Sequence, residues 1–128
     1  MLAIEATRSS PRIVFHEDEE TLEITGESYP ENSFEFFGPV FSWLQAELPR
    51  RSGMKLRVHV SYMNSSSTKC MLDILDMFGE RAAAGAEVSV QWLYEDGNER
   101  ALELAEEFRE DLDLPFEIRP IDPEPRDT

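Results

Sequence analysis

Two segments of the chain alternate apolar and polar side chains at every second position, and a segment with helical spacing separates them. The alternation at 54–63 and 88–94 is typical of β-strands. Between these segments, apolar residues recur every three or four positions after the serine run at 65–67, and Gly85 follows where a helix would end. A strand, a helix and a second strand in this order predict two parallel strands joined by a right-handed crossover. The apolar positions are Leu56, Val58, Val60 and Tyr62 in the first strand, Met71, Leu72, Ile74, Leu75, Phe78 and Ala82 in the helix, and Val88, Val90, Trp92 and Tyr94 in the second strand; the other side of the first strand carries Lys55, Arg57, His59 and Ser61.

The rest of the chain extends this unit in both directions. Short β-branched or alternating segments precede it, and a helical stripe with an acidic outer face and a last short strand follow it. We therefore expect an α/β fold: a single domain, residues 1–119, with a mixed β-sheet, three helices and the order βββαβαβαβ. Residues 120–128 contain three prolines and are expected to form a disordered acidic tail. The further predicted elements are strands at 2–6, 12–15, 21–25 and 116–119, a helix at about 36–48 with Pro39 in its first turn, and a helix at 101–112.

The charge of the chain limits its partners. Among 128 residues, 27 Asp and Glu outnumber 12 Lys and Arg, which gives a formal net charge of −15. Because nucleic-acid affinity comes largely from basic side chains that neutralise phosphates, this charge opposes binding to nucleic acid and to anionic membranes. Residues 95–128 hold 13 acidic and 4 basic residues, a net charge of −9.

Targeting and redox features favour a cytoplasmic protein. The N-terminal residues lack the pattern of a secretion signal, and no window approaches about 18 consecutive apolar residues, so we expect neither secretion nor membrane insertion. The single cysteine, Cys70, cannot form an internal disulfide, which favours a reducing compartment.

The sequence lacks the common enzyme signatures. It contains no glycine-rich phosphate loop, no paired His or Cys at metal-ligand spacing and no nucleophile elbow, so we expect no cofactor and no metal. His16 and His59 are interpreted as surface or strand-edge residues. Cys70 lies in the first turn of a predicted helix, where the helix dipole could lower its thiol pKa, but a small core residue is the favoured interpretation. A small enzyme that uses Cys70, Glu27 or His59 is the weakest of the functional alternatives.

The segment Ser65-Ser66-Ser67-Thr68-Lys69 joins a predicted strand to a predicted helix, at the sheet edge where open α/β sheets carry their sites. One interpretation is structural, because Asn64, Ser65 or Ser66 can cap the helix. One cap needs a single side chain, however, and here four hydroxyls follow Asn64. The other interpretation is therefore phosphorylation, since a phosphate at a helix start meets free N–H groups and a favourable dipole, with Lys69 nearby.

A second candidate is the loop at 26–32, which either connects a strand to a capped helix or contacts a partner. The aromatic residues that follow it, Phe34, Phe36 and Phe37 with Trp43, are expected mainly in the core, although they outnumber what one buried stripe needs.

Several of these segments together resemble the SiaC family of bacterial regulatory phosphoproteins, over residues 1 to 119. The resemblance depends on Ile24-Thr25-Gly26-Glu27-Ser28-Tyr29-Pro30-Glu31-Asn32, then Phe36-Phe37-x-Pro39 and Trp43, then Tyr62-x-Asn64-Ser65-Ser66-Ser67-Thr68-Lys69, and Val90-x-Trp92-x-Tyr94-Glu95. The first and third segments are specific in combination, whereas either one alone would be weak.

The resemblance implies a non-enzymatic phospho-switch with a topology like that of the anti-sigma-factor antagonists (STAS-like). It implies phosphorylation by a dedicated kinase, dephosphorylation by a phosphatase of the PP2C type, and, in the unphosphorylated state, binding and activation of a diguanylate cyclase, with control of cyclic di-GMP signalling and of biofilm formation and aggregation. By motif match, the phosphorylated residue is Thr68. The partner-binding residues expected around it are Asn64, Ser65, Ser66, Ser67 and Lys69, with Glu27, Ser28, Tyr29, Pro30, Glu31 and Asn32 of the loop. The alternative is an anti-sigma-factor antagonist that acts in a transcriptional partner switch.

Overall fold

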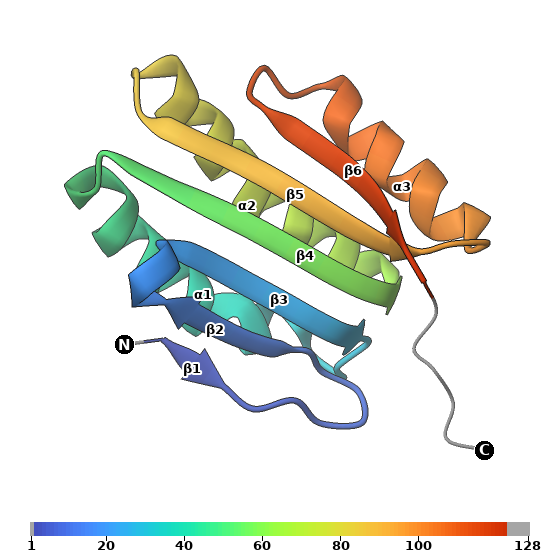
Figure 1. Ribbon diagram of the computed structural model, residues 1–128. Helices are drawn as coiled ribbons and strands as arrows, with labels where there is room; N and C mark the ends of the chain where they lie inside the picture. Colours follow the sequence, from blue (N-terminus) through green and yellow to red (C-terminus); the bar gives the residue numbers. More distant parts are fainter. Residues whose placement is uncertain (1, 123–128) are drawn as a thin grey trace.

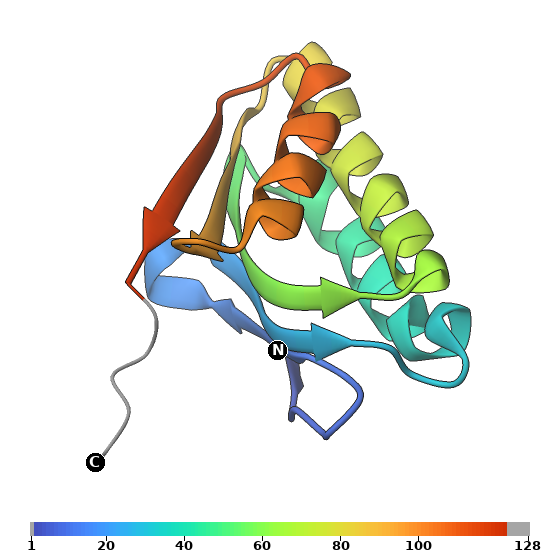
Figure 2. The same ribbon diagram turned by 90° about the vertical axis from the view of Figure 1, so that its right-hand side faces the viewer.

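The computed structural model describes residues 2–122, which form one mixed sheet with all helices packed on one face (Figures 1 and 2). The observed order confirms the predicted βββαβαβαβ arrangement and the α/β fold class. The elements are β1 (Ala3–Ile4), β2 (Arg12–His16), the 3-10 turn η1 (Glu17–Glu19), β3 (Thr21–Ser28), α1 (Ser33–Glu47), the 3-10 turn η2 (Leu48–Arg50), β4 (Gly53–Met63), α2 (Ser65–Ala83), β5 (Glu87–Glu95), α3 (Glu99–Glu110) and β6 (Phe116–Ile121).

The strands lie in the sheet in the order in which they occur in the chain, from β1 to β6. The strands β1, β2 and β3 pair antiparallel, and β3, β4, β5 and β6 pair parallel. Each helix therefore connects two adjacent parallel strands. Because every crossover has the same hand and adds its strand in the same direction, the three helices must lie on the same face. Figure 2 shows this two-layer arrangement.

The core lies between the sheet and the helices. Apolar side chains of β2 to β5 that point to the helical face are almost fully buried. The largest of them, Trp92 on β5, packs against Phe108 of α3 with ring centroids 5.1 Å apart. The largest fully buried side chains are Ile13, Phe15, Leu22, Ile24, Phe37, Leu44, Leu56, Met71, Ile74, Leu75, Phe78 and Trp92.

The first helix begins at Ser33, three residues before its predicted start, because Asn32 caps it. The Asn32 Oδ1 atom accepts a hydrogen bond from the backbone N–H of Glu35 at 3.1 Å. The prediction that Pro39 lies in the first turn is therefore wrong: Pro39 lies inside the helix. Gly38 precedes it, and without a Cβ atom this residue escapes much of the restriction that proline places on its predecessor.

The parallel pairing of β3 and β4 contains a β-bulge, which the alternation pattern does not reveal. Gly26 pairs with Val60 but Glu27 pairs with Tyr62, so Ser61 is an extra residue on β4. A bulge disrupts the alternation of side chains. Tyr62, predicted on the buried side of the strand, is consequently 54% exposed, and that prediction is wrong.

The buried stripe of α2 is also rotated relative to its predicted position. Its buried residues are Ser67, Cys70, Met71, Ile74, Leu75 and Phe78. Leu72, which was placed in the stripe, is 42% exposed. Leu72 lies one residue beyond Met71, which corresponds to a rotation of about 100° around the helix axis.

The last strand, β6, continues to Ile121, so the predicted tail begins too early. Pro120 lies within β6, which pairs only with β5 among residues 2–122, and a proline is compatible with such an edge position. The remainder of the predicted tail, residues 123–128, lies outside the described residues.

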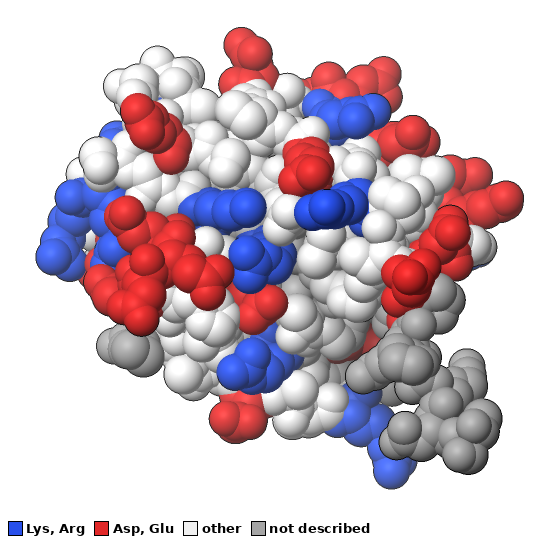
Figure 3. Space-filling view, in the orientation of Figure 1, with Lys and Arg blue, Asp and Glu red and all other residues white. Residues whose placement is uncertain are grey.

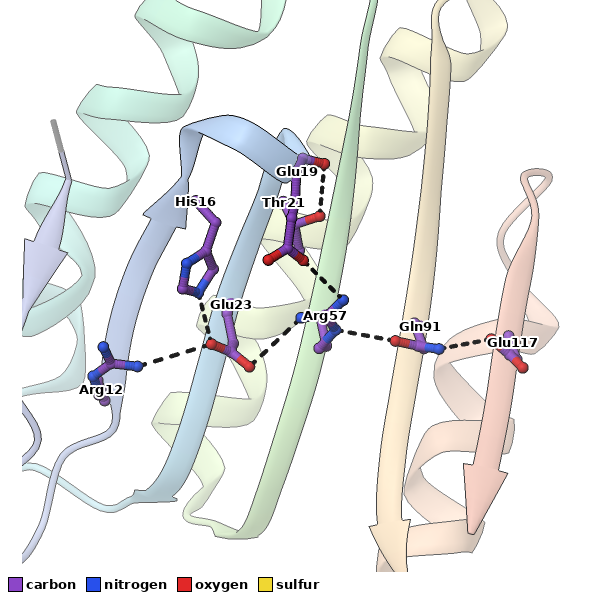
Figure 4. Close-up of polar contacts among 8 residues, drawn as sticks. All are labelled: Arg12, His16, Glu19, Thr21, Glu23, Arg57, Gln91 and Glu117. Carbon is purple, nitrogen blue, oxygen red and sulfur yellow. Dashed lines mark hydrogen bonds and ion pairs between the residues drawn. The ribbon is translucent and has the colours of Figure 1, made fainter. Parts of the chain in front are cut away.

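The sheet face opposite the helices carries a network of polar side chains (Figure 4). Arg57 lies at its centre: its Nη2 atom is 3.4 Å from Glu19 Oε1, and its Nε–H donates to Gln91 Oε1 at 3.1 Å. Glu23 contacts His16 at 2.8 Å. Lys and Arg side chains gather over the middle of this face, with acidic groups mostly toward its margins (Figure 3). None of the large apolar residues that are exposed within residues 2–122 belongs to this network.

Within residues 2–122, none of the helices combines the length and the apolar character that a membrane crossing requires.

Candidate functional site

The two predicted candidate segments meet at the carboxyl edge of β3 and β4. The backbone N–H of Asn64, after β4, donates to the carbonyl oxygen of Ser28, the last residue of β3, at 2.9 Å. The loop that follows β3 leads into α1, and Asn64 leads directly into α2. The starts of α1 and α2 therefore lie side by side, as the hydroxyl contacts between them also require.

A cluster of serine hydroxyls connects these elements. Ser28 Oγ donates to Ser67 Oγ at 2.7 Å, and Ser66 Oγ donates to Ser33 Oγ at 2.8 Å. Ser33 Oγ and Ser67 Oγ lie 3.0 Å apart. Ser28, Ser33 and Ser67 are at most 1% exposed. Ser28 and Ser67, both predicted to bind a partner, are thus buried and cannot contact a partner directly in this structure; we call Ser28, Ser33, Ser66 and Ser67 the hydroxyl cluster.

Asn64 is the residue that caps α2, which settles the choice among three candidates. Its Oδ1 atom accepts a hydrogen bond from the backbone N–H of Ser67 at 2.9 Å and a weaker one from Ser66 Oγ at 3.4 Å. Ser65 is exposed. The serine run is therefore divided between an exposed first residue and two residues whose hydroxyls join the cluster.

Thr68 is half-buried in the first turn of α2. Its hydroxyl donates to the carbonyl oxygen of Asn64 at 3.0 Å, and its backbone N–H donates to the same oxygen at 2.9 Å. Thr68 is one of the residues that line a cavity of about 450 Å³, which extends to the end of β4 and to α3. Thr68 therefore lies beside open space, and its hydroxyl makes one hydrogen bond as a donor, to the Asn64 carbonyl oxygen.

Lys69 points away from this arrangement. Its side chain is 63% exposed, and its Nζ atom lies 3.7 Å from Asp73 Oδ1 on the same helix. The sequence predicts Lys69 beside a phosphate on Thr68. Adjacent residues of a helix differ by about 100° in direction, however, so the two side chains do not point the same way.

The loop after β3 contributes an aromatic surface. The Tyr29 backbone N–H donates to the Ser9 carbonyl oxygen at 2.7 Å, which holds the loop against the turn before β2. The Tyr29 and Tyr62 rings meet edge to face, with centroids 5.9 Å apart. Glu27 is half-buried on β3, Pro30 is half-buried in the loop, and Glu31 is exposed.

Sequence reasoning missed the exposure of three large apolar side chains. Large exposed hydrophobic residues within 2–122 are Tyr29, Phe34, Tyr62 and Leu72. Phe34 is in the first turn of α1 and is 56% exposed, although it was expected mainly in the core; Phe37 is fully buried as expected. The available signal was the surplus of aromatic residues over one buried stripe. Tyr62 and Leu72 gave no such signal, because a bulge and a rotated stripe exposed them.

The residues of the enzymatic alternative are not brought together. Cys70 is fully buried on the helical side of the sheet, and His59 alternates with the buried face of β4 and so points to the opposite side. Burial raises the pKa of the Cys70 thiol, with a smaller raising effect from Asp73, which is opposite to the suggested dipole effect. Among residues 2–122, no group of three His, Cys, Asp or Glu side chains is arranged to hold a metal ion.

A comparison with protein families shows to which family the chain belongs. A sequence model described as SiaC family regulatory phosphoprotein matches residues 4–121. The chain belongs to the SiaC family. The resemblance drawn from the sequence is therefore confirmed, and the matched residues include the hydroxyl cluster, Thr68 and the tyrosine pair.

Known relatives of this SiaC family chain cover nearly all of it. An uncharacterized protein of Pseudomonas aeruginosa (strain UCBPP-PA14) is 43% identical over 122 residues, which are 94% of this chain and 97% of the relative. The crystal structure of the diguanylate cyclase SiaD in complex with its activator SiaC from Pseudomonas aeruginosa contains a similar chain: 43% identity, 94% of this chain, 100% of that chain and a TM-score of 0.90. Apo-SiaC from Pseudomonas aeruginosa is 41% identical with a TM-score of 0.85, over 92% of this chain and 97% of that chain.

Proposed function

We propose that this chain is a non-enzymatic phospho-switch that binds and activates a diguanylate cyclase when Thr68 is unmodified. The observation that carries the proposal is the position of Thr68, half-buried beside a cavity that Tyr62 of the exposed tyrosine pair also lines. The likeness to SiaC, which is described as the activator of the cyclase SiaD and crystallised in complex with it, supports the choice of partner. Control of cyclic di-GMP signalling, and through it of biofilm formation and aggregation in the cytoplasm of a bacterium, would follow.

The apolar residues Tyr29, Phe34, Tyr62 and Leu72 are the proposed core of the contact surface. Interfaces are enriched in aromatic side chains, and a tyrosine combines a large apolar area with a polar tip. Residues 60–68 contain no charged side chain, so this part of the edge can lose its water at low cost. The proposed rim contacts are the exposed residues Ser65, Lys69 and Glu31. The residues proposed to support the surface from behind are Glu27, Pro30, Asn32 and Asn64, with Ser28, Ser66 and Ser67 of the hydroxyl cluster.

Modification would act through a kinase and a PP2C-type phosphatase. In the forward step, Thr68 Oγ1 attacks the γ-phosphorus of ATP, the bond from that phosphorus to the bridging oxygen breaks, ADP leaves, and the hydroxyl proton passes to a base of the kinase. In the reverse step, water attacks the phosphorus, and threonine and inorganic phosphate are released. The hydrogen bond from Thr68 to the Asn64 carbonyl must break before the forward step.

The phosphate would oppose the contact by its charge. It adds about −1.5 to −2 charges. Within an otherwise uncharged stretch this dianion would have to be desolvated when a partner docks, and it would repel acidic partner groups. Binding should therefore fall without unfolding of the chain.

The test is binding of the full chain to the diguanylate cyclase of its own organism, measured by calorimetry together with cyclic di-GMP production. We expect Thr68→Asp to weaken binding by about tenfold or more, which corresponds to about 1.4 kcal/mol, and Thr68→Ala to preserve it. Ser52→Asp, an exposed position before β4 at the opposite end of the sheet, controls for added charge and should bind normally.

Three outcomes would contradict the proposal. The first is binding of Thr68→Asp that is as tight as that of the wild type and Thr68→Ala. The second is phosphopeptide mapping, on protein from its own cells, that places the phosphate only on Ser65, Ser66 or Ser67. The third is co-purification of a sigma-factor-binding kinase in place of a cyclase, which would favour the anti-sigma-factor antagonist alternative.

A further inference from the structure

The cavity beside Thr68 is lined by residues of β4, α2, β5 and α3. Thr68 lines it from α2, Tyr62 and Met63 from the end of β4, and Arg100 and Leu104 from α3. Its volume is about 450 Å³, which is ample for a phosphate group with its hydration water. A phosphate attached to Thr68 therefore has space on the α3 side of its own molecule.

Arg100 is the cation that faces this space. Within residues 2–122, the Arg100 side chain makes no hydrogen bond and no ion pair, whereas Arg50, Arg51 and Arg57 each contact a glutamate. Arg100 is exposed, so its long side chain can reorient. Its guanidinium group is thus uncommitted in the unmodified protein.

The other charged groups around the cavity would either repel a phosphate on Thr68 or are directed elsewhere. Glu103 and Glu107 of α3 also line it, and both would repel a phosphate. Lys69 is closer to Thr68 in the sequence, but it does not line the cavity and lies 3.7 Å from Asp73. Among the charged side chains that line the cavity, Arg100 is therefore the one that would attract a phosphate on Thr68.

We propose that the guanidinium group of Arg100 receives the phosphate on Thr68, so that the modified chain holds its phosphate across its own cavity. This inference rests on the proposed function, because it takes Thr68 as the modified residue. The planar donors of arginine match two phosphate oxygens at once, which a lysine cannot do. The resulting ion pair occupies the cavity and ties the start of α2 to the start of α3. In the phosphorylated chain, the ion pair then closes the cavity between α2 and α3, in addition to making the surface more negative.

The experiment is a phosphorus NMR titration of the full chain with phosphothreonine encoded genetically at position 68. The second pKa of a phosphothreonine is about 6, and a nearby arginine lowers it because it favours the dianion. We expect the folded protein to titrate at lower pH than the same protein in urea. We expect Arg100→Gln to raise the midpoint of the folded protein by about 0.5 pH unit, since an exposed pair is partly screened.

Two matched variants remove the same charge elsewhere. Lys69→Gln removes the cation next to Thr68, and Arg109→Gln removes one at the other end of α3; neither residue lines the cavity. Both should move the midpoint by less than half of the Arg100→Gln effect. Equal titration of the wild type and Arg100→Gln, or an equal effect of Lys69→Gln, would overturn the inference. Thermal unfolding of each unmodified variant checks that the fold is intact.

This test separates the inference from the function it rests on. The encoded phosphothreonine needs no kinase, so a response to Arg100→Gln supports the pair even if cellular phosphate maps elsewhere and the proposed function fails. If encoded phosphothreonine abolishes cyclase binding but its titration midpoint is the same with and without Arg100, the proposed function stands and the Arg100 pair is refuted.

Discussion

At the scale of single residues, the Ser67 hydroxyl joins two others that come from different elements. It accepts from Ser28 at 2.7 Å and lies 3.0 Å from Ser33, with no exposed surface. We expect Ser67→Ala to lower the free energy of unfolding by about 1–2 kcal/mol, because the buried Ser28 hydroxyl loses its acceptor. The measurement is urea unfolding, with Ser65→Ala at the neighbouring exposed position as the control, which should change stability by less than about 0.5 kcal/mol.

The same cluster predicts non-additivity. Ser33→Ala and Ser67→Ala remove two ends of one contact, so the double variant should lose less stability than the two single variants together. Strict additivity would show that the two hydroxyls do not interact.

Cys70 lies two residues beyond Thr68 but in a different environment. Burial raises the pKa of its thiol and shields it from solvent. We expect a disulfide reagent at pH 8 to label the native protein roughly 100-fold more slowly than the denatured protein, because labelling requires local opening. Ser65→Cys, at the exposed start of the same helix, adds a second thiol that should label rapidly. Rapid labelling of Cys70 in the native wild type would contradict this and would reopen the enzymatic alternative.

At the scale of elements, two glycines should respond oppositely to the same substitution. A Cβ atom on Gly53, at the start of β4, would overlap the carbonyl oxygen of Glu87 and lie 3.2 Å from its carbonyl carbon. Gly53→Ala should therefore force β4 and β5 apart and cost about 2 kcal/mol. A Cβ atom on Gly79, inside α2, meets only Leu112 Cδ2 at 3.5 Å, an ordinary contact. Gly79→Ala should gain up to about 1 kcal/mol from helix propensity.

Thermal or urea unfolding of both variants checks this pair. An unchanged stability of Gly53→Ala would show that the strands can separate at that point without loss, and a destabilised Gly79→Ala would show that the space beside Leu112 is smaller than the structure has it.

The sequence predicted which segments form strands and helices. It did not predict which side chains of these elements are exposed at the site. Alternation and helical spacing identified β4, α2 and β5, because these segments each bury one regular face. The exposure of Tyr62 depends on the bulge opposite Gly26, and a bulge arises from pairing with another strand, which no local pattern reports. Arg100 is a further case: nothing in its own segment indicates that it shares a cavity with Thr68, because the fold brings them together from 32 positions apart.

At the scale of the whole molecule, the net charge of −15 is unevenly arranged. The open sheet face balances its charges internally, with Arg57 between Glu19 and Glu23. The acidic excess is concentrated in the C-terminal quarter, residues 95–128, which includes α3. Residues 60–68, within the edge proposed for partner binding, carry no charged side chain, so one added phosphate changes this stretch more than it would change an already charged one.

The order of the strands also bears on how the chain is assembled during synthesis. Because each strand pairs with the one made just before it, the sheet can grow from β1 toward β6 as the chain leaves the ribosome. The hydroxyl cluster can close once α2 has emerged, since all its members precede residue 83. The cavity beside Thr68 needs α3, and thus nearly the entire chain. A kinase that recognises the cavity would therefore act only on finished molecules, whereas one that reads the serine run alone could also modify nascent ones.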